Sequence, residues 1–205
     1  MASSFNDSTT EPIMVRLQDA NIPMSVLQEK NPDINRFTAS VIAFRQSSET
    51  PSQPEVLLIQ RGYEGSWGGS WEVPGGGYET GKDVSILQTA LRETKEEASL
   101  EISSNFIFPL VYRTTFWHKE SRMASYTFIV ELSKEVPIVL SDEHLDWGFF
   151  NEKDIWLFSP YEKGKSQDGH VMLKRKKETL RNFFFKKESL RNGDVNTQNP
   201  TERTD

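Results

Sequence analysis

Short runs of apolar and β-branched residues, separated by polar loops, dominate the first part of the chain. Two of them, residues 36–44 and 55–62, flank a loop at 45–54 that is rich in Ser, Pro and Gln. A third run, residues 70–76, is stopped by a Pro-Gly pair. Because β-branched and aromatic residues fit extended strands and Pro and Gly end them, these runs predict two strands joined by a surface loop and a third extended segment.

The pattern becomes helical after the third run and returns to strands further on. Residues 106–118 and 123–132 are again rich in strand-forming residues, and residues 144–151 have the pattern of another short strand. Residues 170–187 predict a closing helix. Its apolar stripe, at helical spacing, consists of Leu173, Leu180, Phe183 and Phe184. Strands, one helix, more strands and a closing helix predict an α/β fold with a mixed sheet covered on both sides.

The helix that follows the third run carries its glutamates on one side. At about 100° per residue, and with Glu93 at zero, Glu97 lies at about +40° and Glu96 at about −60°. Ile86 and Ala90 fall close to this acidic sector, where they would lie under the glycine loop. The rest of the wheel predicts a packing face at Leu87, Leu91, Thr94, Ala98 and, nearer the helix start, Val84.

Three like charges on one helix face repel each other, unless the face is simply solvated or a positive charge lies between them. A solvated face is by itself the commoner explanation, because Glu is a good helix former. Two further features favour a cation. Gly75, Gly76 and Gly77 allow the backbone to approach a ligand closely, and Arg92, directly before the acids, can pair with a carboxylate across the loop. Hard cations such as Mg²⁺ prefer oxygen ligands of this kind.

This stretch resembles the signature of the Nudix hydrolase family, in which a glycine, five residues, a Glu and seven further residues precede Arg-Glu, two residues and Glu-Glu. Arg92, Glu93, Glu96, Glu97 and Leu100 match the second half of that signature. The preceding Trp-Glu-Val-Pro-Gly-Gly-Gly is similar to the family's strand and loop. The resemblance implies a Nudix-like α/β/α sandwich, with a mixed β-sheet between helices.

The first half of the signature departs from the family pattern. Counted from the glycine loop, Lys82 or Asp83 stands where the family has an acid. Either Asp83 or Glu79 partners Arg92, or that partner is missing. Ser99 replaces the glycine that follows the helix, where a left-handed C-cap favours Gly. Because the metal-binding half is intact, we favour an active enzyme, with a catalytically inactive nucleotide-binding module as the alternative.

The resemblance implies hydrolysis of a diphosphate linkage in a nucleoside diphosphate derivative, with Mg²⁺ or Mn²⁺ and an activated water. Glu96 and Glu97 become the leading metal ligands, and Glu93 becomes a ligand or the base that orients water. Many relatives supply a further acid from a later loop, for which Glu143 is the first choice and Glu120 the reserve. The implied site comprises the catalytic residues Arg92, Glu93, Glu96 and Glu97; the metal ligands Glu93, Glu96, Glu97, Glu143 and the Gly75 carbonyl; and Gly76 and Gly77 against the substrate.

Composition narrows the chemistry further. The absence of cysteine excludes disulfides, a thiolate nucleophile and a cysteine zinc site, so a metal must be held by oxygen or histidine. A formal net charge of −6 argues against nucleic-acid binding as the main role, although residues 174–177 read Lys-Arg-Lys-Lys. This basic run could attract a polyphosphate, but on an amphipathic helix such a run is more often a solvated face.

Aromatic residues are the candidates for holding the part of the substrate beyond the phosphates. Trp71 has the pattern of a residue packed in a strand, whereas Trp117 and Trp147 stand beside polar residues and are the better candidates for stacking on a nucleobase. No stretch discriminates between dinucleotides, nucleoside triphosphates, sugar nucleotides, caps and inositol pyrophosphates. We expect a small nucleotide-type substrate.

Residues 13–188 are predicted to form one Nudix-like hydrolase domain, with polar tails at 1–12 and 189–205. No apolar run approaches the length of about 18 residues that a membrane span needs, and the first twenty residues lack the pattern of a signal peptide. We therefore expect a cytoplasmic protein that does not bind membranes. Exposed apolar residues in 106–118 would allow a homodimer.

Overall fold

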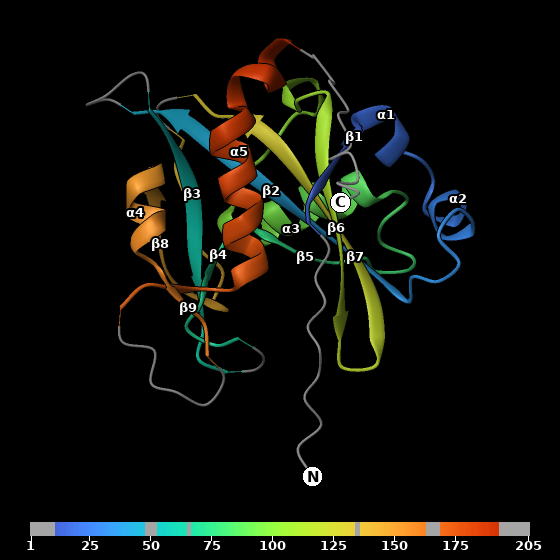
Figure 1. Ribbon diagram of the computed structural model, residues 1–205. Coiled ribbons are helices and arrows are strands. Elements are labelled where there is room, and N and C mark those ends of the chain that lie inside the picture. The colour runs from blue at the N-terminus through green and yellow to red at the C-terminus, as the bar shows by residue number, and fades with distance from the viewer. Residues whose placement is uncertain (1–10, 48–52, 65–66, 134–135, 163–168, 193–205) are drawn as a thin grey trace, which may run out of the picture.

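The computed structural model describes residues 11–47, 53–64, 67–133, 136–162 and 169–192, with side chains as far as Lys186 (Figure 1). The eight strands of its main sheet are β1 (Ile13–Arg16), β2 (Arg36–Gln46), β3 (Pro54–Arg61), β4 (Trp71–Glu72), β5 (Gly75–Gly77), β6 (Leu110–His118), β7 (Ser121–Glu131) and β8 (His144–Phe150). A separate parallel pair is formed by β9 (Ser159–Pro160) and β10 (Val171–Met172). The helices are α1 (Leu17–Ala20), α2 (Met24–Glu29), α3 (Ile86–Ala98), α4 (Glu152–Leu157) and α5 (Lys174–Asn192), with a 3₁₀ turn at Ser104–Phe106.

The main sheet is mixed, as the sequence predicted. Its strand order is β1-β6-β7-β2-β3-β4, while β5 pairs with β2 and β8 pairs with β3. The long central strands β2 and β7 run parallel, from Arg36 opposite Met123 to Phe44 opposite Glu131. The neighbouring pairs β6–β7, β2–β3 and β3–β8 are antiparallel.

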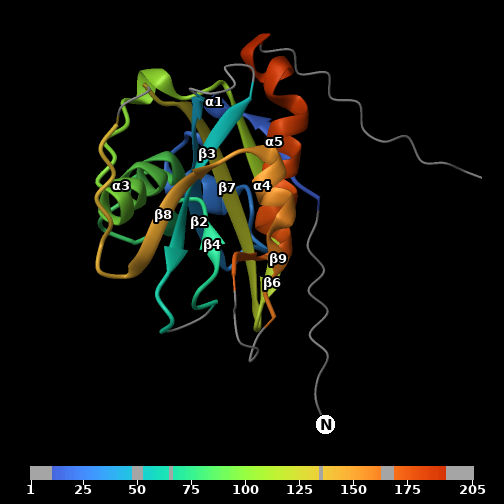
Figure 2. The ribbon, with the colours of Figure 1, turned by 90° about the vertical axis from the view of Figure 1, so that its left-hand side faces the viewer.

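The sheet lies between helices on its two faces, which confirms the predicted three-layer arrangement. Figure 2 shows α3 on one side of the strands and α4 and α5 on the other. Alternate side chains of β7 serve the two layers: Phe128 packs in the cluster that contains Ile86 of α3, whereas Ile129 packs in the cluster that contains Leu180 of α5. All four residues of the predicted apolar stripe of α5 are buried.

Some elements differ from the sequence prediction. The strand expected at 106–118 begins only at Leu110, because a 3₁₀ turn and Pro109 precede it. The closing helix α5 extends to Asn192, four residues into the predicted C-terminal tail, and residues 193–205 lie outside the described part of the chain. Of the predicted N-terminal tail, residues 1–10 also lie outside the described part. Within that part, no helix combines the length and apolar character needed to cross a membrane.

The packing face of α3 is also shifted from the predicted one. Val84 is 71% exposed, because it precedes the N-cap Ser85 and the helical wheel does not apply to it. Ile86 and Ala90 are fully buried and belong to the core beneath the sheet. The predicted residues Leu87, Thr94 and Ala98 are buried as well.

Candidate active site

Helix α3 is fixed at both ends by its own sequence. The Ser85 hydroxyl caps the first turn by accepting a hydrogen bond from the Gln88 amide at 3.3 Å. At the other end Ser99 adopts a left-handed conformation with φ of 52°, which is the conformation that a glycine would favour there. The helix packs against β2 and places its acidic residues next to the glycine strand β5.

Glu97 is the most deeply placed of the four motif residues. It is 8% exposed, and its Oε2 accepts a hydrogen bond of 2.7 Å from the Gly75 amide. Burial and the negative charges of Glu72 and Glu93 raise the pKa of Glu97 to about 8, despite that hydrogen bond. The Glu97 carboxyl is therefore an acid whose ionised form would be stabilised by an added positive charge.

Glu93 faces the same glycine strand from one turn earlier. A Cβ added at Gly76 would lie 2.4–2.5 Å from the carboxylate atoms of Glu93, so only glycine permits this approach. Burial raises the pKa of Glu93, although Arg92 opposes the shift. Gly75 has a similar role on the other side of β5, because a Cβ there would lie 2.3 Å from the Ala39 carbonyl oxygen.

Arg92 joins the helix to the loop that follows β5. Its guanidinium donates to both carboxylate oxygens of Asp83 at 2.9 Å, while the Glu79 carboxylate lies 3.7 Å away. Asp83 is therefore the principal partner that the sequence left open. Burial alone would raise the pKa of Asp83, but the hydrogen bonds from Arg92, Glu79 and Thr89 hold it below its usual value. Lys82 pairs with Glu79 at 2.7 Å on the exposed side of this loop.

Arg92 also forms ion pairs with two of the predicted metal ligands. It donates to Glu93 at 2.9 Å and to Glu96 at 2.8 Å, and the Glu96 side chain is 53% exposed. In the described part of the chain, no group of three or more Asp, Glu or His residues is assembled closely enough to hold a metal ion.

The donor chemistry nevertheless suits a hard divalent cation. The candidate ligands are carboxylate and carbonyl oxygens, which such cations prefer. The raised pKa values of Glu93 and Glu97 show that positive charge close to them would favour their ionised forms. These residues therefore suit a hard divalent cation in chemistry, although the described residues do not form a complete cage.

Three residues near Glu97 were not identified from the sequence. Glu72, on β4, is 5% exposed and binds Arg61 of β3 at 2.6 Å. The Nε2 atom of His144 lies 3.5 Å from Glu97 Oε1, and its Nδ1 lies 3.1 Å from the Ser141 hydroxyl. Burial lowers the pKa of His144, which favours the neutral ring. The sequence did contain one signal for Glu72. It is an acid between two hydrophobic residues, Trp71 and Val73, shortly before the glycines.

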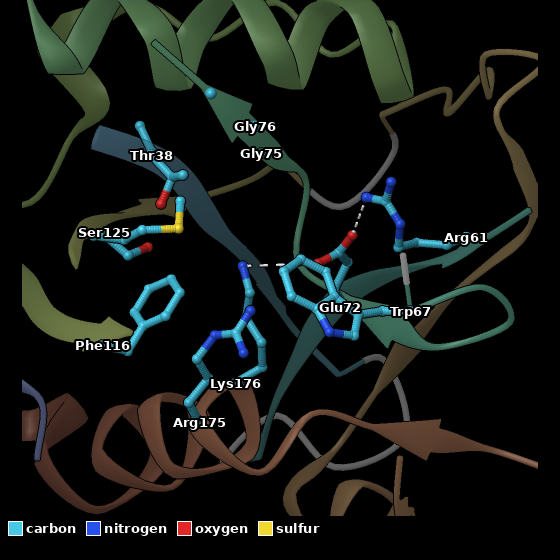
Figure 3. A pocket seen from close by; sticks show the side chains of 13 residues that line it. Thr38, Arg61, Trp67, Glu72, Gly75, Gly76, Phe116, Ser125, Arg175 and Lys176 are labelled. Atoms are coloured by element: carbon cyan, nitrogen blue, oxygen red, sulfur yellow. Dashed lines mark hydrogen bonds and ion pairs between the residues drawn. The ribbon is translucent and has the colours of Figure 1, made fainter. Parts of the chain in front are cut away.

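A pocket of about 180 Å³ opens beside this site. As Figure 3 shows, Gly75 and Gly76 lie on one side of it, and Arg175 and Lys176 of α5 lie on the opposite side. Thr38 of β2 and Ser125 of β7, which are register partners, form part of the wall between them. The aromatic part of the lining consists of Trp67 and Phe116.

The two tryptophans predicted to stack on a base do not line this pocket. Trp117 follows Phe116 on β6, and because side chains alternate along a strand, Phe116 faces the pocket while Trp117 is 46% exposed. Trp147 lies on β8 opposite Ile59 and is 40% exposed. Trp67, in the loop after β3, takes the aromatic position instead, with a left-handed φ of 63°.

The remaining predicted site residues are Glu143, Glu120 and Gly77. Glu143 is exposed in the turn before β8, where its backbone carbonyl accepts a hydrogen bond from the Gly62 amide at 2.8 Å. Its role as a further metal ligand stays a prediction. Glu120, the reserve candidate, is exposed between β6 and β7, and Gly77 contributes its carbonyl oxygen to Arg92 at 3.0 Å.

Comparisons with known proteins agree with this architecture. A family model described as NUDIX domain matches residues 35–174. The asymmetrical bis(5'-nucleosyl)-tetraphosphatase of Caenorhabditis elegans is 29% identical over 108 residues, which cover 52% of this chain and 75% of that protein.

Two solved structures share the fold. The MutT/nudix family protein from Enterococcus faecalis has a TM-score of 0.54 and 19% identity, over 81% of this chain and 69% of that one. The dihydroneopterin triphosphate pyrophosphohydrolase of E. coli has a TM-score of 0.51 and 17% identity, over 74% of this chain and 98% of that one. At these identities the likeness extends to the fold alone, and it confirms the predicted fold class.

Proposed function

This chain belongs to the NUDIX family, and from that membership we propose that it hydrolyses a diphosphate linkage in a nucleotide substrate with the help of Mg²⁺ or Mn²⁺. The family match and the related tetraphosphatase confirm the prediction of a Nudix pyrophosphohydrolase. The substrate and the metal are the parts that we propose.

The observation that carries the proposal is the buried Glu97 carboxyl, with its pKa near 8, held by the Gly75 amide beside the pocket. The residues that would hold the cation are Glu93, Glu96 and Glu97, with the Gly75 carbonyl as a backbone ligand. When bound, a divalent cation offsets charge on the phosphate oxygens and lowers the pKa of bound water.

The chain's own residues divide the remaining work. Gly75 and Gly76 let the backbone approach the acids and a phosphate chain closely. Glu93, which faces the glycine strand beside Glu97, is the motif acid that we assign either as a metal ligand or as the base that orients the attacking water. Arg92, through Asp83, holds α3 against the loop and keeps these groups aligned.

A dinucleoside tetraphosphate is the first substrate to test. The related C. elegans protein is named for this class of compound, and the pocket beside the acids carries cationic side chains that suit a long phosphate chain. Nucleoside triphosphates and ADP-ribose are the comparison substrates, because they present three and two phosphates.

The Glu97→Gln variant tests the proposal, and Glu101→Gln, just beyond the end of α3, is its control. We expect phosphate-product release from at least one substrate by wild type with Mg²⁺ or Mn²⁺, and none with a chelator. Glu97→Gln should lower kcat by about 100-fold or more, the scale expected when a group that aligns reacting atoms is lost. Glu101→Gln, whose side chain is 75% exposed and pairs only with Lys95 among the described ion pairs, should retain wild-type rates. Full activity in Glu97→Gln would refute the assignment, and wild-type silence with every substrate would favour the binding module.

A further inference from the structure

The pocket wall opposite the glycine strand is basic, although the chain has a formal net charge of −6. Arg61, Arg175 and Lys176 line the pocket, and Glu72 is the one carboxylate among its described lining residues. Figure 3 shows that Arg175 and Lys176 both extend from α5 toward the hollow. The pocket therefore combines a glycine wall beside acids with a cationic wall from a distant part of the sequence.

The residues of the basic run 174–177, at the start of α5, make different contacts from one another. Lys174 is 87% exposed at its side chain, and Lys177 donates to the backbone carbonyls of Trp156 and Phe158 at 3.0 and 2.7 Å. Only Arg175 and Lys176 of this run line the pocket. Of the two alternatives that the sequence left open for this run, the position of these two residues favours attraction of a polyphosphate over a purely solvated face.

Lys176 is held in position from the floor of the pocket. Its side chain is 19% exposed, and its Nζ lies 3.8 Å from Glu72 Oε2. The other oxygen of Glu72 binds Arg61 at 2.6 Å, so one carboxylate serves two cations. Burial lowers the pKa of Lys176 although Glu72 opposes the shift. Glu72 offsets only part of the cost of removing the Lys176 charge from water. A further anion in the pocket would offset more of that cost and favour the charged lysine.

Arg175 is held by two aromatic rings. Its guanidinium carbon lies 4.7 Å from the centroid of Trp67 and 4.3 Å from that of Phe116. Stacking uses the faces of the guanidinium, whereas its N–H donors lie in the plane, in the fork geometry that matches phosphate oxygens. The two rings thus hold the charged Arg175 guanidinium beside the pocket that it lines.

From this arrangement we infer that Arg175 and Lys176 form a subsite for a further phosphoryl group of the substrate, which makes the enzyme favour chains of three or more phosphates over two. The inference rests on the proposed function, in which the reacting linkage lies along Gly75 and Gly76 beside the acids of α3. A longer phosphate chain in the same pocket extends from the glycine wall to the basic wall. A substrate with two phosphates places fewer anionic oxygens there.

Direct binding of inorganic phosphates tests the subsite without turnover. Titration calorimetry in the presence of a chelator, with pyrophosphate and tripolyphosphate as ligands, should show wild type binding tripolyphosphate about tenfold or more tightly. Lys176→Met and Arg175→Gln should each weaken tripolyphosphate binding by about tenfold, the scale of a lost charge-assisted hydrogen bond. Lys174→Met removes the same charge from an exposed neighbour and should change the affinity less than about twofold.

Steady-state kinetics provide the second readout. With diadenosine tetraphosphate, Lys176→Met and Arg175→Gln should raise KM by about tenfold with kcat largely retained, and with ADP-ribose KM should change less than about threefold. Equal changes for both substrates, or changes matched by Lys174→Met, would overturn the subsite. Thermal unfolding checks that each variant folds; if Lys176→Met does not, Arg175→Gln decides.

The two measurements separate this inference from the proposed function. Suppose that wild type hydrolyses nothing but binds tripolyphosphate, and that Lys176→Met loses this binding. That result supports the subsite and rejects the hydrolase. Hydrolysis with unchanged tripolyphosphate affinity in both variants rejects the subsite and leaves the hydrolase standing.

Discussion

Gly76 shows how a single missing methyl group lets the Glu93 carboxylate of α3 lie against the backbone of β5. A Cβ at this position would lie 2.4 Å from the carboxyl carbon of Glu93, whereas a Cβ at Gly77 would meet nothing within 4 Å. Gly76→Ala should therefore displace the Glu93 carboxylate and lower kcat/KM by about tenfold or more. The free energy of unfolding should fall by only about 1 kcal/mol or less, because the end of a flexible side chain can move aside. Gly77→Ala is the matched steric control: it leaves the Glu93 carboxylate in place, so it should lower kcat/KM and the free energy of unfolding less than Gly76→Ala does. Steady-state kinetics and urea unfolding measure the difference, and equal behaviour of the two variants would contradict the argument.

At the residue scale, the sequence predicted positions along one helix better than contacts between distant elements. The spacing of Glu93, Glu96 and Glu97 placed them on one face of α3, and Arg92 pairs with an acid in the loop as expected. The choice between Asp83 and Glu79 needed the fold, because both follow the glycines within a few residues. Position 176 offered one signal, since it is four residues before the buried Leu180 and so lies on the apolar stripe.

At the element scale, the C-cap of α3 is strained by its side chain. Ser99 has a left-handed φ of 52°, a conformation that disfavours residues with a Cβ by about 1 kcal/mol. Ser99→Gly should therefore raise the free energy of unfolding by about 0.5–1 kcal/mol. Ser99→Ala keeps the Cβ and should give no such gain. Chemical denaturation with both variants measures the effect, and stabilisation of the same size in Ser99→Ala would show that the backbone conformation is not its cause.

The strands and helices that the sequence predicted are those with long periodic patterns. β2, β3, β7 and the two long helices were recognised, because many residues repeat the same pattern in each. The elements β1, α1, α2 and α4 have four to six residues each, which is too short for a period to be visible. α4 begins with a capping box between Asn151 and Asp154, a signal that the sequence did contain.

At the scale of the whole molecule, the site depends on both layers that cover the sheet. α3 supplies the acids from one face, and α5 supplies Arg175 and Lys176 from the other, with β4 and β5 between them. Glu72 and Lys176 are 104 positions apart in the sequence and lie 3.8 Å apart in the fold. Local sequence patterns do not reveal a pairing between such distant residues. This explains why the grouping of the acids on α3 could be predicted, whereas the basic run at 174–177 could not be placed opposite them.

The same coupling makes the stability of the metal-free protein depend on pH. The pKa of Glu97 is raised from 4.5 to about 8, so between these values the folded state keeps a proton that the unfolded state has lost. The stability that Glu97 contributes to the folded state is therefore fully present below its unfolded pKa of 4.5, and it is lost as pH rises through about 8. The maximal slope is about 1.4 kcal/mol for each pH unit. His144, with a lowered pKa, contributes in the opposite sense only below about 6.5, so the window from pH 6.5 to 8 is the one to test.

The difference between wild type and Glu97→Gln isolates this contribution. Glu93 has a raised pKa and Lys176 a lowered one, and because both residues remain in the variant, they enter both pH profiles. In a chelator, wild type should therefore lose stability relative to Glu97→Gln as pH rises from 6.5 to 8, while Glu101→Gln should follow wild type. Mg²⁺ should restore more stability at pH 8 than at 6.5, because it binds the ionised carboxylates. Parallel pH profiles for wild type and Glu97→Gln in urea unfolding would show that Glu97 titrates in its usual range.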